Sequence, residues 1–557
     1  MCLCSLRFST VRTMANSCAW FVFCIAVCAA SWGQTTSTDA TSAATGSEHG
    51  LRGVVVNSVS GEPVRRALVV ASGGTSHSML TDAEGRFEFE NLPDLEVVIA
   101  ARKPGFFNDL ELHPETFQPQ VARPGVTSSL VLKLMPESQV VGHIATVKGE
   151  PIEDAPVRIF HEHIVDGRKK LELRNQAITD EDGQFHLAGL TPGVYLLAAG
   201  PVLSGARTSP GRIGVVREEG FSTIFYPGVP ELDGAEPIVI SGGQQVQADF
   251  SLKPEPLFRV AGTAVGSAPG TGAQVQFINK AGENVAAPID FNVNTGKFST
   301  RLPAGSYVLQ IRETNTQGSM MSGDLLLVVN ADLENLSVGL GLPPMLPVEV
   351  ELHPTNSANE GADRGLRRQQ LLAQVRLVST EKHVQPLEFP AQTDERGALV
   401  VANFMPGRYS VEATPLPPWC VQSVTTGNVD LLQEDLVLGY GGRPEPVHIV
   451  LRDDCSAVRG KIHADGKPAS GTLVLIPDRA SATHAQIGMA SADVDYLFAT
   501  LAPGDYRVLA FPSAEGLEFR NPEVLSPYLS KAVRVTLPPN EISNIDVERI
   551  TVGKESQ

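Results

Sequence analysis

A short phrase returns about once per hundred residues along this chain, a spacing typical of one compact β-sandwich per copy. In its clearest copy, residues 179–195, an acidic Gly turn leads to Phe185 and a Pro-Gly turn leads to Tyr195. Asp can accept a local backbone N–H and Gly supplies a positive φ, so the first part predicts a tight turn between strands. We expect the tyrosine ring in the core, with its hydroxyl on a turn carbonyl.

The phrase predicts an all-β fold, a tandem array of about five antiparallel β-sandwiches arranged as a semi-rigid rod or a curved array. In the first copy the closing tyrosine is replaced by Val97, and in the fifth Tyr496 stands where the turn Gly is expected. A Gly-containing strand opens most modules. The turn recurs at residues 81–87, 294–298, 393–399 and 493–498, and the closing tyrosines are Tyr195, Tyr307, Tyr409 and Tyr506.

The N-terminus predicts export. Residues 1–33 combine Arg7 and Arg12 with an apolar run at 18–30 and small residues at the exit, as in a signal peptide cleaved near Gly33. The run is short for an uncleaved membrane anchor, and we expect no transmembrane span in the mature chain. Residues 34–49 are predicted to be a disordered spacer. The mature protein is therefore expected in the periplasm, at the cell surface or outside the cell.

Charge and cysteine content restrict the partners and the redox state. The net charge is −18, and an acidic surface repels phosphate backbones, so we expect no nucleic-acid partner. Five of the seven cysteines lie in the leader, which leaves Cys420 and Cys455. We predict a disulfide between them, with two unpaired thiols as the alternative.

The motifs of the repeat resemble the carboxypeptidase regulatory-like domain, a prealbumin-like β-sandwich. The resemblance rests on a Gly-x-Pro-Val turn at 61–64, the Thr-Asp-x-x-Gly-x-Phe turn at 81–87 and the Leu-x-Pro-Gly-x-Tyr element at 190–195. Residues 53–136 and 140–254 match it best, and nearly the whole mature chain is similar to multi-module secreted bacterial proteins. We predict modules at residues 50–136, 137–256, 257–344 (divergent), 345–454 (divergent) and 455–551, followed by a tail at 552–557.

No stretch predicts catalysis, and we assign no catalytic residue, no metal and no cofactor. His161-Glu162-His163 is a dense histidine cluster whose imidazoles could share one face of a strand, but structural zinc usually needs four ligands. The Asp180–Gly183 segment lacks the spaced oxygens of a calcium loop and is better explained as a turn.

Binding is the predicted role, by a non-catalytic secreted or envelope-associated array that serves as a scaffold for an unknown protein or polysaccharide partner. The alternative is a carbohydrate-binding protein acting in polysaccharide capture or adhesion, with aromatic rings stacked on sugars. Trp419 is the best single candidate for an exposed platform, but we favour the alternative that it fills the contact between modules four and five. Ligand contacts are also proposed for Tyr226, Tyr440 and Tyr528, and Tyr496 is a further spare ring. Function is expected in the variable stretches 161–176, 201–235 and 415–455.

Overall fold

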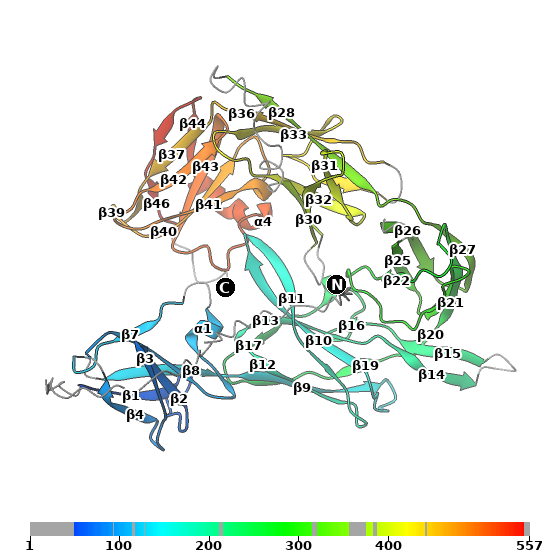
Figure 1. Ribbon diagram of the computed structural model, residues 1–557, viewed down its shortest axis with the longest axis horizontal. Helices are drawn as coiled ribbons and strands as arrows, with labels where there is room; N and C mark the ends of the chain where they lie inside the picture. Colours follow the sequence, from blue (N-terminus) through cyan, green and yellow to red (C-terminus); the bar gives the residue numbers. More distant parts are fainter. Residues whose placement is uncertain are drawn as a thin grey trace, which may run out of the picture.

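The computed structural model describes residues 49–92, 94–113, 117–126, 129–210, 216–314, 320–355, 375–381, 387–439 and 443–550. The predicted signal peptide, nearly all of the spacer, the tail and Tyr440 lie outside these ranges. Within them, helices are too short and too polar to traverse a lipid bilayer. The described chain is all-β, as predicted, and its sheets follow one another in sequence around the molecule (Figure 1).

One strand plan recurs along the chain. The opening strand of each module runs antiparallel to the strand that follows the acidic turn and parallel to a late strand of the same module. In modules one, two, three and five a second sheet packs over this one, and apolar side chains of both sheets fill the space between them. The first module has the sheet β4 (Arg86–Leu92), β1 (His49–Asn57), β8 (Leu130–Pro136) and β6 (Phe106–Phe107), the sheet β3 (Thr75–Leu80), β2 (Leu68–Gly73), β5 (Val97–Arg102) and β7 (Gln120–Ala122), and helix α1 (Asp109–Leu112).

The second and third modules extend this plan. The second has β12 (Gln184–Leu190), β9 (Ser138–Thr146), β18 (Gln245–Gln247) and β19 (Phe250–Leu252) against β11 (Arg168–Ile178), β10 (Pro156–Val165), β13 (Gly193–Ala199), β16 (Ile224–Phe225) and β17 (Ile238–Ile240), with the additional strands β14 (Val202–Pro210), β15 (Val216–Phe221) and β20 (Glu255–Pro256) and the turn η1 (Leu232–Gly234). The third has β23 (Asp290–Asn292), β24 (Lys297–Leu302), β21 (Phe258–Val265) and β27 (Leu333–Gly339) against β22 (Ala273–Ile278), β25 (Gly305–Thr314) and β26 (Met320–Val329).

The last two modules complete the array. The fourth is one continuous sheet, in the order β34 (Val429–Asp430), β33 (Cys420–Thr426), β36 (Val447–Arg452), β28 (Met345–His353), β31 (Leu399–Ala402), β30 (Glu388–Thr393), β29 (Val375–Ser379), β32 (Gly407–Ala413) and β35 (Leu436–Leu438). The fifth has β42 (Tyr496–Leu501), β37 (Ser456–Gly460) and β45 (Ile542–Asn544), with β39 (Lys467–Pro468), β38 (Ile462–Ala464) and β46 (Val547–Glu548), against β41 (Gln486–Ala490), β40 (Gly471–Pro477), β43 (Gly504–Phe511) and β44 (Val533–Leu537); its short helical segments are η3 (Ala482–His484), α4 (Pro522–Leu525) and η4 (Ser526–Lys531).

The repeated phrase performs the structural task expected of it. Asp180 Oδ1 accepts the backbone N–H groups of Asp182 and Gln184 at 3.1 and 2.8 Å, and Gly183 has a φ of 72°. Every closing tyrosine donates its hydroxyl to the carbonyl four residues earlier: Tyr195 at 2.8 Å, Tyr307 at 3.2 Å, Tyr409 at 2.6 Å and Tyr506 at 2.7 Å. All four rings are buried, and burial raises the pKa of Tyr307 to about 12. These tyrosines are core residues, as predicted.

The glycine of the opening strand makes room for the aromatic ring of the turn. Gly53 lies opposite Phe87, and Gly142 lies opposite Phe185. A Cβ on Gly142 would lie 1.8 Å from the Ala248 carbonyl oxygen and 2.6 Å from the Phe185 ring. The glycine thus lets a parallel strand and an aromatic ring approach from two sides.

The same pairing corrects one sequence alignment. Gly460 lies opposite Tyr496 and Val458 opposite Phe498, just as Gly53 lies opposite Phe87 and Leu51 opposite Phe89. Tyr496 is therefore the counterpart of the turn phenylalanine and does not occupy the Gly position. It is 1% exposed and donates its hydroxyl to the Ile545 carbonyl at 2.6 Å, so it is not a spare ring for a ligand.

We expect Gly142→Ala to destabilise the second module by about 1 to 3 kcal/mol, because the new methyl group must displace backbone as well as the ring. Hydrogen exchange of the full chain, followed by mass spectrometry of peptides from residues 137–256, measures this loss. Gly272→Ala is the matched control, since an added Cβ there meets no atom within 4 Å. Equal exchange in the two variants would contradict the steric role of Gly142.

Candidate functional site at the junction of modules two, four and five

The hairpin of β10 and β11 leaves its own module. Asp166 and Gly167 form its two-residue turn, with φ values of 50° and 70°, the pattern of a type I′ turn. Val157 and Ile159, at the base of the hairpin, belong to the core of the second module. The tip reaches the region of α4 in the fifth module (Figure 1). The array is therefore closed by a contact between modules far apart in sequence.

The turn fits closely against the fifth module. The backbone N–H of Arg520 donates to the Gly167 carbonyl at 3.0 Å, and Arg520 Nη2 donates to Asp166 Oδ2 at 2.9 Å. A Cβ on Gly167 would lie 2.7 Å from the Phe519 ring, so this contact requires glycine as well as a positive φ. Asp166 and Arg520 lie 354 residues apart in sequence.

Two basic side chains that follow the turn form ion pairs with carboxylates of module four. Arg168 Nη1 lies 2.6 Å from Glu412 Oε1, and Lys170 Nζ lies 2.5 Å from Glu388 Oε1. Because residues 168 and 170 lie on one face of β11, a shift of the hairpin by one residue would separate both pairs. The charges therefore define how the hairpin docks.

Glu412 contacts three arginines, one from each of three modules. Arg376 donates to its Oε2 through Nε at 2.8 Å, and Arg520 Nη1 donates to its Oε1 at 3.1 Å, in addition to Arg168. The Glu412 side chain is only 10% exposed. Burial alone would raise its pKa, but the charges of Arg168 and Arg520 and the hydrogen bond from Arg376 hold the pKa below the ordinary value. We call the acceptor surface formed by Arg376, Glu388, Glu412, Phe519 and Arg520 the socket.

Closure of the array should therefore depend on pH. The pKa of Glu412 is lower in the docked state than the ordinary 4.5. Its contribution is complete above pH 4.5 and is lost as the pH falls through the lower, docked value. We expect the radius of gyration from small-angle scattering to be constant from neutral pH to about 5 and to increase below about 4. An increase already at pH 6 would point to a histidine instead.

A cavity of about 460 Å³ adjoins the socket, and residues of all three modules line it. Lys170 and Glu162 come from the hairpin, Thr380 and Glu388 from module four, and Asn521 from module five. The walls combine charged, hydroxyl and amide groups with the apolar side chains of Leu171, Val378, Leu387 and Pro522, and no aromatic ring is among the lining residues. Hairpin residues form one wall of the cavity, so release of the hairpin would open it.

The histidine pair on β10 packs against a core tyrosine. The ring centroids of His161 and His163 are 5.3 Å apart, and His161 stacks on Tyr195 at 4.8 Å. Burial lowers the pKa of His161, and the neighbouring His163 lowers it further. Among the described residues, no group of three or more metal-ligating side chains converges here or elsewhere.

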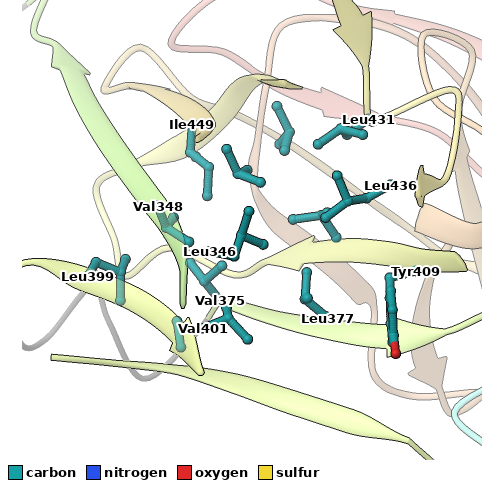
Figure 2. Packing of buried hydrophobic residues seen from close by; sticks show 14 of the residues in the cluster. Leu346, Val348, Val375, Leu377, Leu399, Val401, Tyr409, Leu431, Leu436 and Ile449 are labelled. Carbon is teal, nitrogen blue, oxygen red and sulfur yellow. The ribbon is translucent and has the colours of Figure 1, made fainter. Parts of the chain in front are cut away.

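Trp419 is not an exposed platform. It is 1% exposed and belongs to the hydrophobic core of module four, part of which Figure 2 shows around Leu377, Leu436 and Tyr409. An indole covered in this way has no face for a sugar, and it packs within module four rather than between modules four and five. The exposed-platform interpretation of Trp419 was therefore wrong.

The remaining ring candidates are partly covered by neighbouring rings. Tyr226 is half-buried and meets Phe250 edge-on, with centroids 6.0 Å apart. Tyr528 is half-buried and meets Phe511 edge-on at 5.3 Å. They lie in modules two and five and do not converge on one site; Tyr440 lies outside the described residues. Their role in ligand binding stays a prediction.

Cys420 and Cys455 form the predicted disulfide, with their Cα atoms 5.8 Å apart. The bridge joins the start of β33 to the segment between β36 and β37, at the boundary of modules four and five. We expect it to add about 3 to 4 kcal/mol by restricting the unfolded chain. Mass measurement with and without reduction should show a difference of two hydrogens, and two free thiols in the native protein would contradict the bridge.

The socket was not recognised in the sequence, although the hairpin tip falls in the variable stretch 161–176. The Asp166-Gly167 pair between two alternating segments was an available hairpin signal. Glu412, Arg376 and Arg520 carry no local signal, because single charges on strands usually face solvent.

Fold and junction together define a closed array of β-sandwich modules. Residues 50–127 match the family model of the carboxypeptidase regulatory-like domain, in agreement with the resemblance noted for the first module. No curated protein matches the chain. Among solved structures, the TIE protein of Bacillus anthracis is 18% identical over 52% of this chain and 50% of its own, with a TM-score of 0.17. The minor pilin of Streptococcus agalactiae is 14% identical over 37% of this chain and 97% of its own, with a TM-score of 0.20. A putative adhesin of Bacteroides ovatus is 11% identical over 37% of this chain and 94% of its own, with a TM-score of 0.16. The chain thus spans half the length of the first of these.

Proposed function

We propose that this protein is an exported, non-catalytic scaffold in which five β-sandwich modules are held in a closed frame for binding at the cell envelope or outside the cell. The observation that carries the proposal is the contact of Glu412 with arginines from modules two, four and five. A chain of independent modules would need no such contact. Closure fixes the relative positions of surfaces that a flexible string would leave free, which lowers the entropy cost of binding a partner.

Two measurements test this proposal on the native protein. Cell fractionation with N-terminal sequencing should recover the mature chain outside the cytoplasm, beginning near residue 34. Small-angle scattering of that chain should fit the closed arrangement of Figure 1. A cytoplasmic chain that retains its leader, or an extended string of modules in solution, would contradict it.

Carbohydrate capture is the alternative function, and it can be tested with the same purified mature chain. Its expected platform, Trp419, is buried, and the cavity at the junction has no aromatic wall. We therefore expect no signal on a glycan array with the mature chain. A reproducible signal that is lost in Tyr226→Ala or Tyr528→Ala would favour the carbohydrate-binding function.

A further inference from the structure

The β10–β11 hairpin is part of module two in the chain, but its tip contacts modules four and five. Asp166, Arg168 and Lys170 have their ion-pair partners in modules four and five. An element that leaves its own module to complete a distant surface of the same chain can complete that surface in a second copy with the same contacts.

The docked contact is mainly ionic rather than apolar. The exposure of its charged side chains ranges from 10% for Glu412 to 43% for Arg376. The Phe519 ring lies against Gly167 and adds an apolar contact. Partly exposed ion pairs contribute little each, and desolvation opposes the buried ones. The hairpin can therefore leave the socket without unfolding the modules that carry them.

The fit nevertheless selects this particular hairpin. The socket requires glycine at the turn, an acid before it and basic residues one and three positions after it. A second copy of the chain carries all four features in the correct register. A general acidic or basic peptide does not.

We propose that the socket is an interaction surface for the β10–β11 hairpin of a second copy, so that the protein assembles by exchange of this hairpin between chains. The hairpin makes the same contacts with the socket of its own chain and with that of a second copy. The balance between the two therefore depends on the protein concentration relative to the effective concentration within one chain, which for linked modules is about millimolar. Exchange is thus favoured where chains are crowded, and dilute chains close on themselves.

A zero-length coupling reagent can follow the exchange in the native protein. A carbodiimide joins an amine to a carboxylate in contact with it, and Lys170 Nζ lies 2.5 Å from Glu388 Oε1. Two preparations of the full mature chain, one labelled uniformly with nitrogen-15 and one unlabelled, are mixed and treated with the carbodiimide at increasing protein concentration. Mass spectrometry then shows whether the two linked peptides come from one chain or from two.

The expected result is coupled peptides of a single isotope at micromolar concentration, and a rise toward the statistical share of mixed pairs near about 1 mM. Lys169 and Glu162, 3.2 Å apart within the hairpin, are the internal control and should give unmixed products throughout. Only unmixed 170–388 products at every concentration would overturn the exchange while leaving the closed frame intact. Absence of any 170–388 product would overturn both.

Discussion

Replacing Glu412 with alanine is expected to release the hairpin from the socket and open the frame. The carboxylate is 10% exposed and is shared by Arg168, Arg376 and Arg520, so its removal takes the common counter-charge from three neighbouring guanidinium groups. Arg376 and Arg520 keep their weaker or more exposed ion pair with Asp166. Removal of one partner from a buried ion pair typically costs about 3 to 5 kcal/mol. We expect an increased radius of gyration and loss of the Lys170–Glu388 coupling product.

Module four should remain folded in this variant, because Glu412 is not one of the residues of its hydrophobic core. Glu349→Ala is the matched control: Glu349 lies on β28 of the same module, its side chain is 61% exposed, and its ion-pair partner is His448. Arg168→Met should open the frame by a similar route, and its effect should not add to that of Glu412→Ala, since the two residues share one contact. Unchanged scattering and coupling in Glu412→Ala would refute the role of this residue in closure.

The strand plan was predictable because its signals are local. The turn Asp, the turn Gly and the closing tyrosine act within a few residues, as the hydrogen bonds of Asp180 and Tyr195 illustrate. Tyr496 was placed in the wrong register because the alignment followed the acidic residues, whereas its strand partner Gly460 defines the position. Alignment by strand partners is possible only once the fold is known.

The socket was not predictable by the same reasoning. Arg520 and Asp166 are 354 residues apart, and neither lies in the repeated phrase. Which of many surface charges meet depends on the angles between successive modules, and these follow from contacts such as the 2.7 Å ion pair of Arg158 with Glu283 between modules two and three. The Asp166-Gly167 pair carries a local hairpin signal, although no hairpin was predicted there, and nothing in the sequence indicates the surface on which the hairpin docks.

Replacing Trp419 with alanine should destabilise module four by about 3 to 5 kcal/mol, because it removes a fully buried aromatic ring from a packed core and leaves a cavity. The residue directly precedes Cys420, so the disulfide would keep this segment near its place while the core around Val424 and Leu451 loosens. Hydrogen exchange of the full chain should show faster exchange in peptides from residues 387–452. Peptides of the first module should be unchanged.

Trp419→Phe is the variant that separates packing from binding. Trp419 Nε1 is buried and has no hydrogen-bond partner among the described residues, so phenylalanine removes an unpaired donor and retains most of the apolar contact. We therefore expect a much smaller loss of stability than for alanine. If Trp419 served as a sugar platform, both variants would fold as stably as the wild type and differ from it in glycan binding. A stability loss graded from alanine to phenylalanine, with no change in glycan binding, would establish a packing role.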